Sequence, residues 1–288
     1  MDTEKNNNRI LNLLGVFLVN RPDFISPDMV RELTDLGMTE EEAFSQLMAA
    51  AFGLDLEEKA EDRELYHSYF PEMIHKMDPT EYLNDPYYIF LKDKDIKKGH
   101  ASLEQVTCKA YEAFVENDFR LYPDGRRIPQ IGFFPEDFRY PAVMEDGRLW
   151  MSIAPNEINT MKEAMDRASG NVLVFGLGLG YFQYRVMQKQ DVRSVTCVEL
   201  NRDIIDLFSE QMLPFFPNRE KLTLVCEDAF HYAEREFPAG KYDYVFTDLW
   251  HDVSDGLPMY LRMKGLEKLA PSGTVFDYWI EKTMKCYM

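Results

Sequence analysis

The residues best suited to chemistry begin with three alternating glycines. Gly176, Gly178 and Gly180 stand between an apolar run, residues 172–175, and a helix-like segment that starts at Tyr181. Glycine lets a chain turn tightly and lets a ligand approach the backbone with no Cβ in the way. A dinucleotide fingerprint needs its third glycine at the sixth position, where this chain has Tyr181. The GxGxG spacing therefore favours a nucleoside ligand without a pyrophosphate over NAD or FAD.

Acidic residues after the next two apolar runs extend this predicted nucleoside site. Glu199 closes the run VTCVEL, where its carboxylate could accept hydrogen bonds from both hydroxyls of a ribose. Asp228 closes LTLVCED and could accept a hydrogen bond from an adenine amino group, with Ala229 and Phe230 against the flat base. Asp228 could equally cap the helix that follows, and both roles can hold at once.

The candidate catalytic groups follow a fourth apolar run. Asp248 ends YDYVFTD and could orient or deprotonate an amine or hydroxyl nucleophile. His251 is a second candidate base, because its titration range suits proton transfer near neutral pH, and Trp250 could form an apolar wall. We predict no metal site from Asp248, His251 and Asp252, because no fourth ligand with helical or strand spacing is visible.

These residues need a sheet whose strands end at a common edge. From residue 156 to 288, short apolar segments alternate with helix-like stretches; the segments are NVLVFG, SVTCVEL, LTLVCED, YDYVFTD and TVFDYW. This alternation predicts a Rossmann-like, doubly wound α/β domain with a mostly parallel sheet and right-handed crossovers. Five strands in this chain order predict the spatial order 3-2-1-4-5.

The residues before this domain are predicted to form two regions. Residues 1–121 are predicted to be a helical domain, with helical periodicity that extends into the run SLEQVTCKAYEAFVENDF. Residues 122–155 are predicted to be a β-hairpin connecting segment, because Glu145-Asp146-Gly147 stands between two apolar runs as a turn would.

Composition limits the classes of partner. Fifty acidic residues against 32 basic ones give a net charge of −18, which repels a phosphate backbone and argues against a nucleic-acid partner. Four cysteines without CxxC spacing predict free thiols of a cytosolic protein rather than disulfides or a zinc site. No apolar run approaches the ~20 residues that cross a bilayer, and the N-terminus is unlike a signal peptide. We expect a cytoplasmic protein with no membrane partner.

Taken together, VLVFGLGLGYF, VTCVELN, LVCEDAF and YDYVFTDLW resemble the class I S-adenosylmethionine-dependent methyltransferases. Within that superfamily the chain is most similar to the spermidine synthase (aminopropyltransferase) branch, over residues 156–288. The resemblance implies that the glycine loop and Glu199 bind the cofactor, that Asp228 contacts adenine, and that Asp248 helps to deprotonate an attacking amine. The implied cofactor is S-adenosylmethionine or its decarboxylated form.

The chain departs from spermidine synthases on the acceptor side. Those enzymes carry GGGDGG at the glycine loop, where this chain has Leu179 in the place of the aspartate and Tyr181 in that of the last glycine. The tyrosine and the glutamine or histidine expected after Glu157 are Thr160 and Met161. The family also adds a sixth and a seventh strand, which this sequence lacks. These departures argue against polyamine synthesis.

Three functions are compatible with this pattern. The first is a methyltransferase acting on a small or peptide-like acceptor, with Asp248 as the base and His251 behind it. The second is an aminopropyltransferase-like enzyme using decarboxylated S-adenosylmethionine. Val174 favours this reading, because that branch lacks the acid that most methyltransferases place there, and Leu179 opposes it. The third is a non-catalytic nucleoside-binding or scaffold protein, favoured by the short sheet and the altered acceptor positions.

The fifth strand predicts an interaction at the sheet edge. The run TVFDYWI is apolar and aromatic, and only EKTMKCYM follows it. A bare edge of this kind would invite uncontrolled strand pairing. We therefore expect cover from a second subunit, giving a homodimer across this edge, or from the N-terminal helices.

Overall fold

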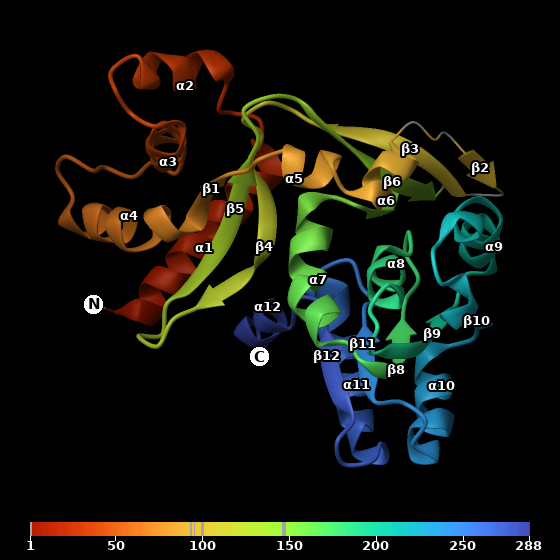
Figure 1. Cartoon of the computed structure of the whole chain (residues 1–288). Coiled ribbons are helices and arrows are strands. Elements are labelled where there is room, and N and C mark those ends of the chain that lie inside the picture. The colour runs from red at the N-terminus through yellow and green to blue at the C-terminus, as the bar shows by residue number, and fades with distance from the viewer. Residues whose placement is uncertain (1, 93, 95, 99–100, 146–147) are drawn as a thin grey trace. The chain divides into compact units, whose positions relative to one another are not determined.

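The computed structural model describes residues 2–92, 94, 96–98, 101–145 and 148–288 (Figure 1). The chain forms two compact units. The first contains Met1–Asp85 and Val106–Tyr140, and the second contains Pro86–Gln105 and Pro141–Met288. The described residues form three sheets, of three, five and four strands.

Helices make up the first part of the first unit. They are α1 (Thr3–Asn20), α2 (Pro27–Thr34), α3 (Glu40–Ala51), α4 (Ala60–Met73) and, after the short strand β1 (Ile74–Lys76), α5 (Thr80–Leu83). The start of α3 is fixed by a capping box: the Thr39 N–H donates to the Glu42 carboxylate over 2.8 Å, and the Glu42 N–H donates to the Thr39 hydroxyl over 3.2 Å.

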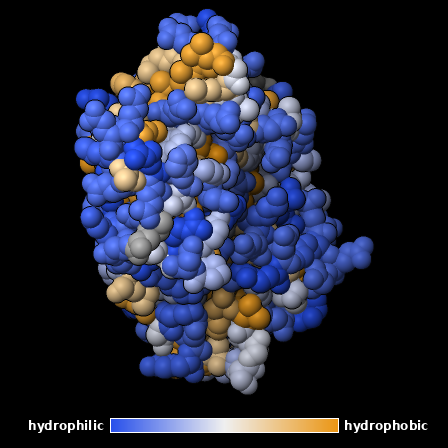
Figure 2. Space-filling view, turned by 90° about the vertical axis from the view of Figure 1, so that its left-hand side faces the viewer, coloured by the Kyte–Doolittle hydropathy of each residue, from blue (hydrophilic) through white to orange (hydrophobic). Residues whose placement is uncertain are grey.

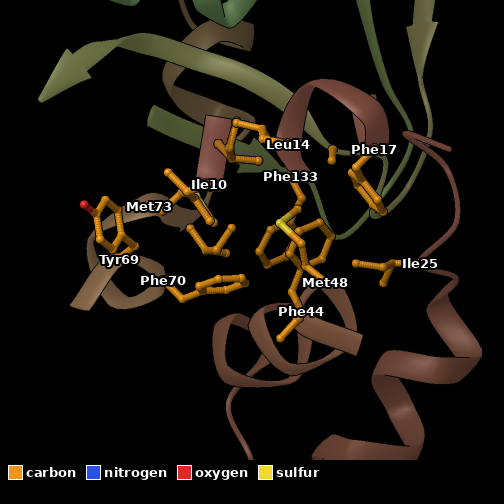
Figure 3. Packing of buried hydrophobic residues seen from close by; sticks show 14 of the residues in the cluster. Ile10, Leu14, Phe17, Ile25, Phe44, Met48, Tyr69, Phe70, Met73 and Phe133 are labelled. Atoms are coloured by element: carbon orange, nitrogen blue, oxygen red, sulfur yellow. The ribbon is translucent and has the colours of Figure 1, made fainter. Parts of the chain in front are cut away.

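The core of this unit lies between the helices and a three-stranded sheet. The strands β4 (Phe114–Leu121) and β5 (Arg127–Phe133) complete that sheet in the order β1-β5-β4, with β1 parallel and β4 antiparallel to β5. Figure 3 shows side chains from α1, α3 and α4 meeting Phe133 of β5. The rings of Phe44 and Phe133 are stacked, with their centroids 4.2 Å apart. In Figure 2 the drawn face of the molecule is mostly hydrophilic, with scattered hydrophobic areas.

The predicted helical character of residues 102–119 is wrong. That segment forms most of β3 (Ala101–Cys108) and β4, and the last helix before it, α6 (Pro86–Leu91), ends ten residues earlier. Helical periodicity is a local signal, whereas β4 is stabilised by pairing with β5, a strand buried along nearly its whole length. This long-range pairing overrides the local preference.

The predicted division at residue 121 is also wrong, because strands of residues 122–155 belong to two sheets. Strand β5 lies in the first unit, whereas β6 (Phe138–Glu145) and β7 (Arg148–Ser152) join β2 (Ile96–Lys98) and β3 in the order β2-β3-β6-β7. Strands β6 and β7 pair antiparallel, as a hairpin requires. The predicted turn residues Asp146 and Gly147 lie outside the described residues.

The main sheet of the second unit has five strands. These are β8 (Gly170–Phe175), β9 (Val192–Glu199), β10 (Leu222–Cys226), β11 (Tyr244–Thr247) and β12 (Val275–Tyr278). All neighbours pair parallel, in the order β10-β9-β8-β11-β12, which is the predicted order 3-2-1-4-5. The central strands β8 and β11 are almost completely buried, as expected where helices cover both faces of a parallel sheet.

Helices alternate with these strands (Figure 1). They are α7 (Pro155–Arg167), α8 (Tyr181–Met187), α9 (Arg202–Gln211), α10 (Ala229–Glu236), α11 (Val253–Leu266) and α12 (Glu281–Cys286), with single 3₁₀ turns at η1 (Leu213–Phe215), η2 (Arg219–Lys221), η3 (Phe237–Ala239) and η4 (Glu267–Leu269). None of the helices within the described residues has both the length and the apolar character needed to traverse a bilayer.

Strand β12 lies at one edge of the sheet and is followed by α12. Its first residue, Val275, is 46% exposed, whereas Asp277 is 9% exposed. The Asp277 carboxylate accepts two hydrogen bonds from the Arg167 guanidinium, over 2.7 and 2.9 Å, and a third from the Tyr244 hydroxyl. These bonds join α7, β11 and β12. The homodimer across this edge stays a prediction.

Candidate functional site

A cavity of about 510 Å³ lies at the carboxyl ends of the strands of the five-stranded sheet. The sheet places it there because each lining loop follows one strand of a parallel set, and such strands all end on the same side. All the residues predicted for the site line this one cavity: Gly176, Gly178, Gly180, Glu199, Asp228, Ala229, Asp248 and His251. Their spatial convergence was predicted from the sequence, and their roles stay predictions.

The three glycines differ in what their lack of a side chain allows. All have positive φ, at 97°, 56° and 78° in chain order. A Cβ at Gly176 would overlap the Asp248 backbone carbonyl, and one at Gly180 would overlap the Phe208 ring, so packing requires both glycines. At Gly178 the nearest atom to an added Cβ is Met151 Sδ, at 3.6 Å. A Cβ at Gly178 would therefore overlap no protein atom, although the positive φ would still strain the backbone of any other residue.

Glu199 fixes the glycine loop to the end of β9. Its Oε2 accepts a hydrogen bond from the Leu177 N–H over 3.1 Å, and its Oε1 accepts one from the Asn201 N–H over 2.8 Å. A carboxylate has about four acceptor sites, so these two bonds leave capacity for ribose hydroxyls. The sequence predicted a ligand-binding acid here and did not anticipate its contacts with the loop.

Asp228 caps helix α10. Its Oδ1 accepts hydrogen bonds from the Phe230 N–H over 3.0 Å and from the His231 N–H over 2.9 Å, which confirms the capping alternative. Ala229 and Phe230 are buried and line the cavity, and the Arg262 guanidinium lies over the Phe230 ring, 4.0 Å from its centroid. The cap holds these two residues at the cavity wall, where a flat base could pack.

Asp248 is partly buried directly after β11, and its pKa is raised. Withdrawal from water raises its pKa to about 7; the neighbouring charge of Glu199 adds to this rise, and His251 opposes it. A carboxyl group with this pKa exchanges a proton readily at neutral pH. This property fits the predicted role of Asp248 as a base.

Glu157, in the first turn of α7, is a site residue that the sequence reasoning missed. It lines the same cavity, and burial raises its pKa well above the usual range, with the charge of Asp248 acting in the same direction. The charge of Asp248 thus disfavours ionisation of Glu157, and acidic groups arranged in this way favour a retained proton or a bound cation. The sequence shows a glutamate two positions after Pro155, but no local pattern placed it near Asp248.

Gln183 is a second missed residue, in helix α8. It is 1% exposed, and its Nε2 donates to the Gly176 carbonyl over 3.0 Å. Its Oε1 has no hydrogen-bond partner among the described residues. Gln183 therefore supports the glycine loop from inside the protein, while Glu199 holds the loop from the β9 side.

The remaining walls of the cavity are mostly apolar. Trp250 and Trp279 are 5% and 6% exposed, and the Trp279 Nε1–H donates to the Thr160 hydroxyl over 2.7 Å. Leu179 and Met161, which replace polar residues of spermidine synthases, are buried and line the cavity. The predicted apolar wall at Trp250 is confirmed.

His251 lies at the start of the loop that leads into α11. Its Nδ1 is 3.0 Å from the Asp255 carboxylate, and its side chain is 48% exposed. Asp252 caps α11 by accepting a hydrogen bond from the Ser254 N–H over 2.6 Å. Within the described part of the chain, no cluster of three or more histidine, cysteine, aspartate or glutamate side chains could hold a metal ion.

Part of the second unit is similar to a known protein family. Residues 156–264 match the spermine/spermidine synthase domain, which confirms the predicted resemblance over that segment. A search of curated protein sequences gave no match. Two solved structures are similar to this chain. One is a Klebsiella pneumoniae protein whose assignment as an O-methyltransferase is provisional, and the other is a spermidine synthase in complex with the transition-state analogue AdoDATO.

Both structural likenesses are limited. The first has 16% sequence identity, a TM-score of 0.32, and covers 41% of this chain and 52% of that one. The second has 16% identity, a TM-score of 0.30, and covers 39% of this chain and 43% of that one. The chain thus spans about half the length of the structures it matches.

Proposed function

We propose that the chain binds S-adenosylmethionine, or its decarboxylated form, and transfers an alkyl group from the sulfonium to an amine acceptor. One observation carries this proposal. A single cavity joins a glycine loop anchored by Glu199 to a pair of carboxyl groups, Asp248 and Glu157, whose pKa values are both raised. The first feature suits a nucleoside and the second suits an acceptor that carries positive charge and must lose a proton.

On the donor side, the open space at Gly178 supports the fit of an adenosyl group. A Cβ at that position would point into space with only Met151 Sδ nearby. The remaining acceptor capacity of Glu199 suits the ribose, and Ala229 and Phe230 offer an apolar surface to the base. The bound sulfonium would supply an activated carbon with a good leaving group, so the protein needs mainly to position the acceptor and take up its proton.

On the acceptor side, charge favours an amine. The cavity is lined by Glu157, Glu199, Glu227, Asp228 and Asp248, and by no lysine or arginine among the residues that the structure describes. This set attracts a cation and repels an anion. Asp248 takes the ammonium proton, which frees the nitrogen lone pair for attack, while Trp250 and Trp279 restrict the orientation of the acceptor.

Methyl transfer to a small or peptide-like amine is the leading form of this proposal. The buried side chains of Leu179 and Met161 make that part of the wall aliphatic, which does not suit the second ammonium group of a diamine. Aminopropyl transfer is the second candidate, and two observations favour it. Residues 156–264 match the spermine/spermidine synthase domain, and buried Val174 lines the cavity where most methyltransferases carry an acid.

The test begins with binding. Isothermal titration with S-adenosylmethionine, S-adenosylhomocysteine and decarboxylated S-adenosylmethionine should detect at least one complex. Gly178→Val should abolish that complex, and circular dichroism checks that the variant keeps its fold, because valine at this positive φ strains the backbone. Gly37→Val is the matched control, because Gly37 also has positive φ and open space around its missing Cβ but lies in the first unit. Absence of binding by all three ligands would refute the proposal.

Turnover then separates the candidate functions. Each donor is incubated with a panel of primary amines, diamines and peptide amines, and the products are identified by mass spectrometry. A mass gain of one methyl group supports methyl transfer, and a gain of one aminopropyl group supports the second candidate. Binding without turnover across the panel would support a non-catalytic nucleoside-binding protein instead.

A further inference from the structure

Asp255, in the first turn of α11, organises the loop that carries the candidate base. Its carboxylate accepts hydrogen bonds from the Asp252 N–H over 3.1 Å and from the His251 N–H over 3.2 Å, and it contacts His251 Nδ1 over 3.0 Å. Asp255 is not among the residues that line the cavity, whereas His251 is. The carboxylate therefore acts from behind the loop.

Helix capping explains only part of this arrangement. Asp252 and Asp255 form a capping box, in which the carboxylate of each accepts a hydrogen bond from the backbone N–H of the other, and Asp252 also accepts one from the Ser254 N–H. A capping box needs no contact with an imidazole. Because an ionised carboxylate can only accept, the Nδ1 of His251 must carry the proton of this bond. The contact therefore sets the tautomer of His251, so that proton exchange at the neutral ring takes place at Nε2.

His251 lies between the cavity and solvent. It lines the cavity three positions after Asp248, and about half of its side chain is exposed. The charge of protonated His251 lowers the pKa of Asp248, against the rise that burial causes. The other acidic side chains near it are Asp252, on the same loop, and the acidic residues that line the cavity with it: Glu157, Glu199, Glu227 and Asp228.

We propose that His251, held by Asp255, passes the acceptor proton from Asp248 to solvent during each transfer. This inference rests on the proposed function. The acceptor ammonium gives one proton to Asp248, its nitrogen forms a bond to the carbon attached to sulfur, and the carbon–sulfur bond breaks with its electron pair left on sulfur. One proton is released in total. It moves from Asp248 to His251 Nε2, and the Nδ1 proton stays with Asp255. Asp255 is a positioning residue in this scheme.

The first test measures the tautomer and needs no turnover. Nitrogen-15 NMR of the full chain, labelled at histidine, is recorded at a pH where the ring of His251 is neutral. The wild type should show the Nδ1–H tautomer, Asp255→Asn should shift the population towards Nε2–H, and Asp252→Asn should leave the tautomer unchanged. Asp252 is the matched control because it belongs to the same capping box. A wild-type Nε2–H tautomer, or no change in Asp255→Asn, would overturn the proposal.

The second test measures the proton step, with the best amine found in the turnover panel. His251→Ala should lower kcat about tenfold or more with KM little changed, and added imidazole should restore much of the loss. Asp255→Asn should also lower kcat, whereas Asp252→Asn should not. Loss of kcat that imidazole fails to restore would overturn the relay. If no amine is a substrate, the proposed function fails and the relay fails with it, while the tautomer result still decides whether Asp255 positions His251.

Discussion

The raised pKa of Asp248 predicts a measurable effect on stability. A pKa that rises from 3.8 to about 7 means that the folded protein binds this proton more tightly than the unfolded chain does. Between these two values the folded state holds more protons, so the contribution of Asp248 to stability is complete below pH 3.8 and declines as pH rises through about 7. Replacement by asparagine removes this decline. Asp248→Asn should therefore gain stability relative to the wild type as pH increases.

The size of the gain follows from the pKa change. At about 1.4 kcal/mol per pH unit, a rise from 3.8 to about 7 corresponds to about 4 kcal/mol. Only the part of this change above pH 5, about 3 kcal/mol, falls within a measurement from pH 5 to pH 8. Asp248 is only partly buried and lines a cavity, so relaxation and water reduce this figure, and we expect about 1–2 kcal/mol.

Urea unfolding at pH 5 and at pH 8 measures this difference, with the free energy of unfolding compared between the wild type and Asp248→Asn. Asp166→Asn is the control, because Asp166 is an exposed aspartate on α7. Between pH 5 and pH 8, the free energy of unfolding of Asp248→Asn should rise relative to that of the wild type, whereas that of Asp166→Asn should not. If this rise is absent, or equal in both variants, the surroundings do not disfavour the charged form of Asp248, and its role as a base at neutral pH is unfounded.

Four further predictions concern ligands and assembly. Glu199→Ala should weaken adenosyl-ligand binding by about 1.5–3 kcal/mol, roughly 10- to 100-fold, and unchanged affinity by calorimetry would remove Glu199 from the site. The protein should not make spermidine from putrescine and decarboxylated S-adenosylmethionine at an enzyme-like rate, and Leu179→Asp alone should not create that activity. Robust spermidine formation in a mass-spectrometric assay would show that Leu179 does not prevent polyamine synthesis. Binding of a cationic amine should strengthen as pH rises through about 7, because Asp248 then becomes charged; equal affinity at pH 5.5 and pH 8 would argue against a contact with Asp248. Light scattering should find a homodimer across the β12 edge, where Val275 is 46% exposed, and a monomer would exclude that interface.

The sequence was most informative where a signal is local and the fold is regular. The glycines around Gly178 mark one strand end, Glu199 marks the next, and Asp248 marks a third. A parallel sheet brings such ends together, so their convergence on one cavity followed from strand order alone. The same reasoning failed for residues 102–119, because β3 and β4 owe their conformation to strands far along the chain.

The parts of the site that escaped prediction depend on tertiary contacts. Glu157 belongs to a helix that precedes the sheet, and only the packed structure places it in the cavity with Asp248. Asp255 has the pattern of a helix cap in the sequence, and its contact with the His251 ring depends on how the loop folds back. Both are carboxylates whose proposed roles depend on a neighbouring group, Asp248 for Glu157 and the His251 ring for Asp255. A motif identifies the groups that face a ligand, whereas the groups that tune them must be found from distances and burial.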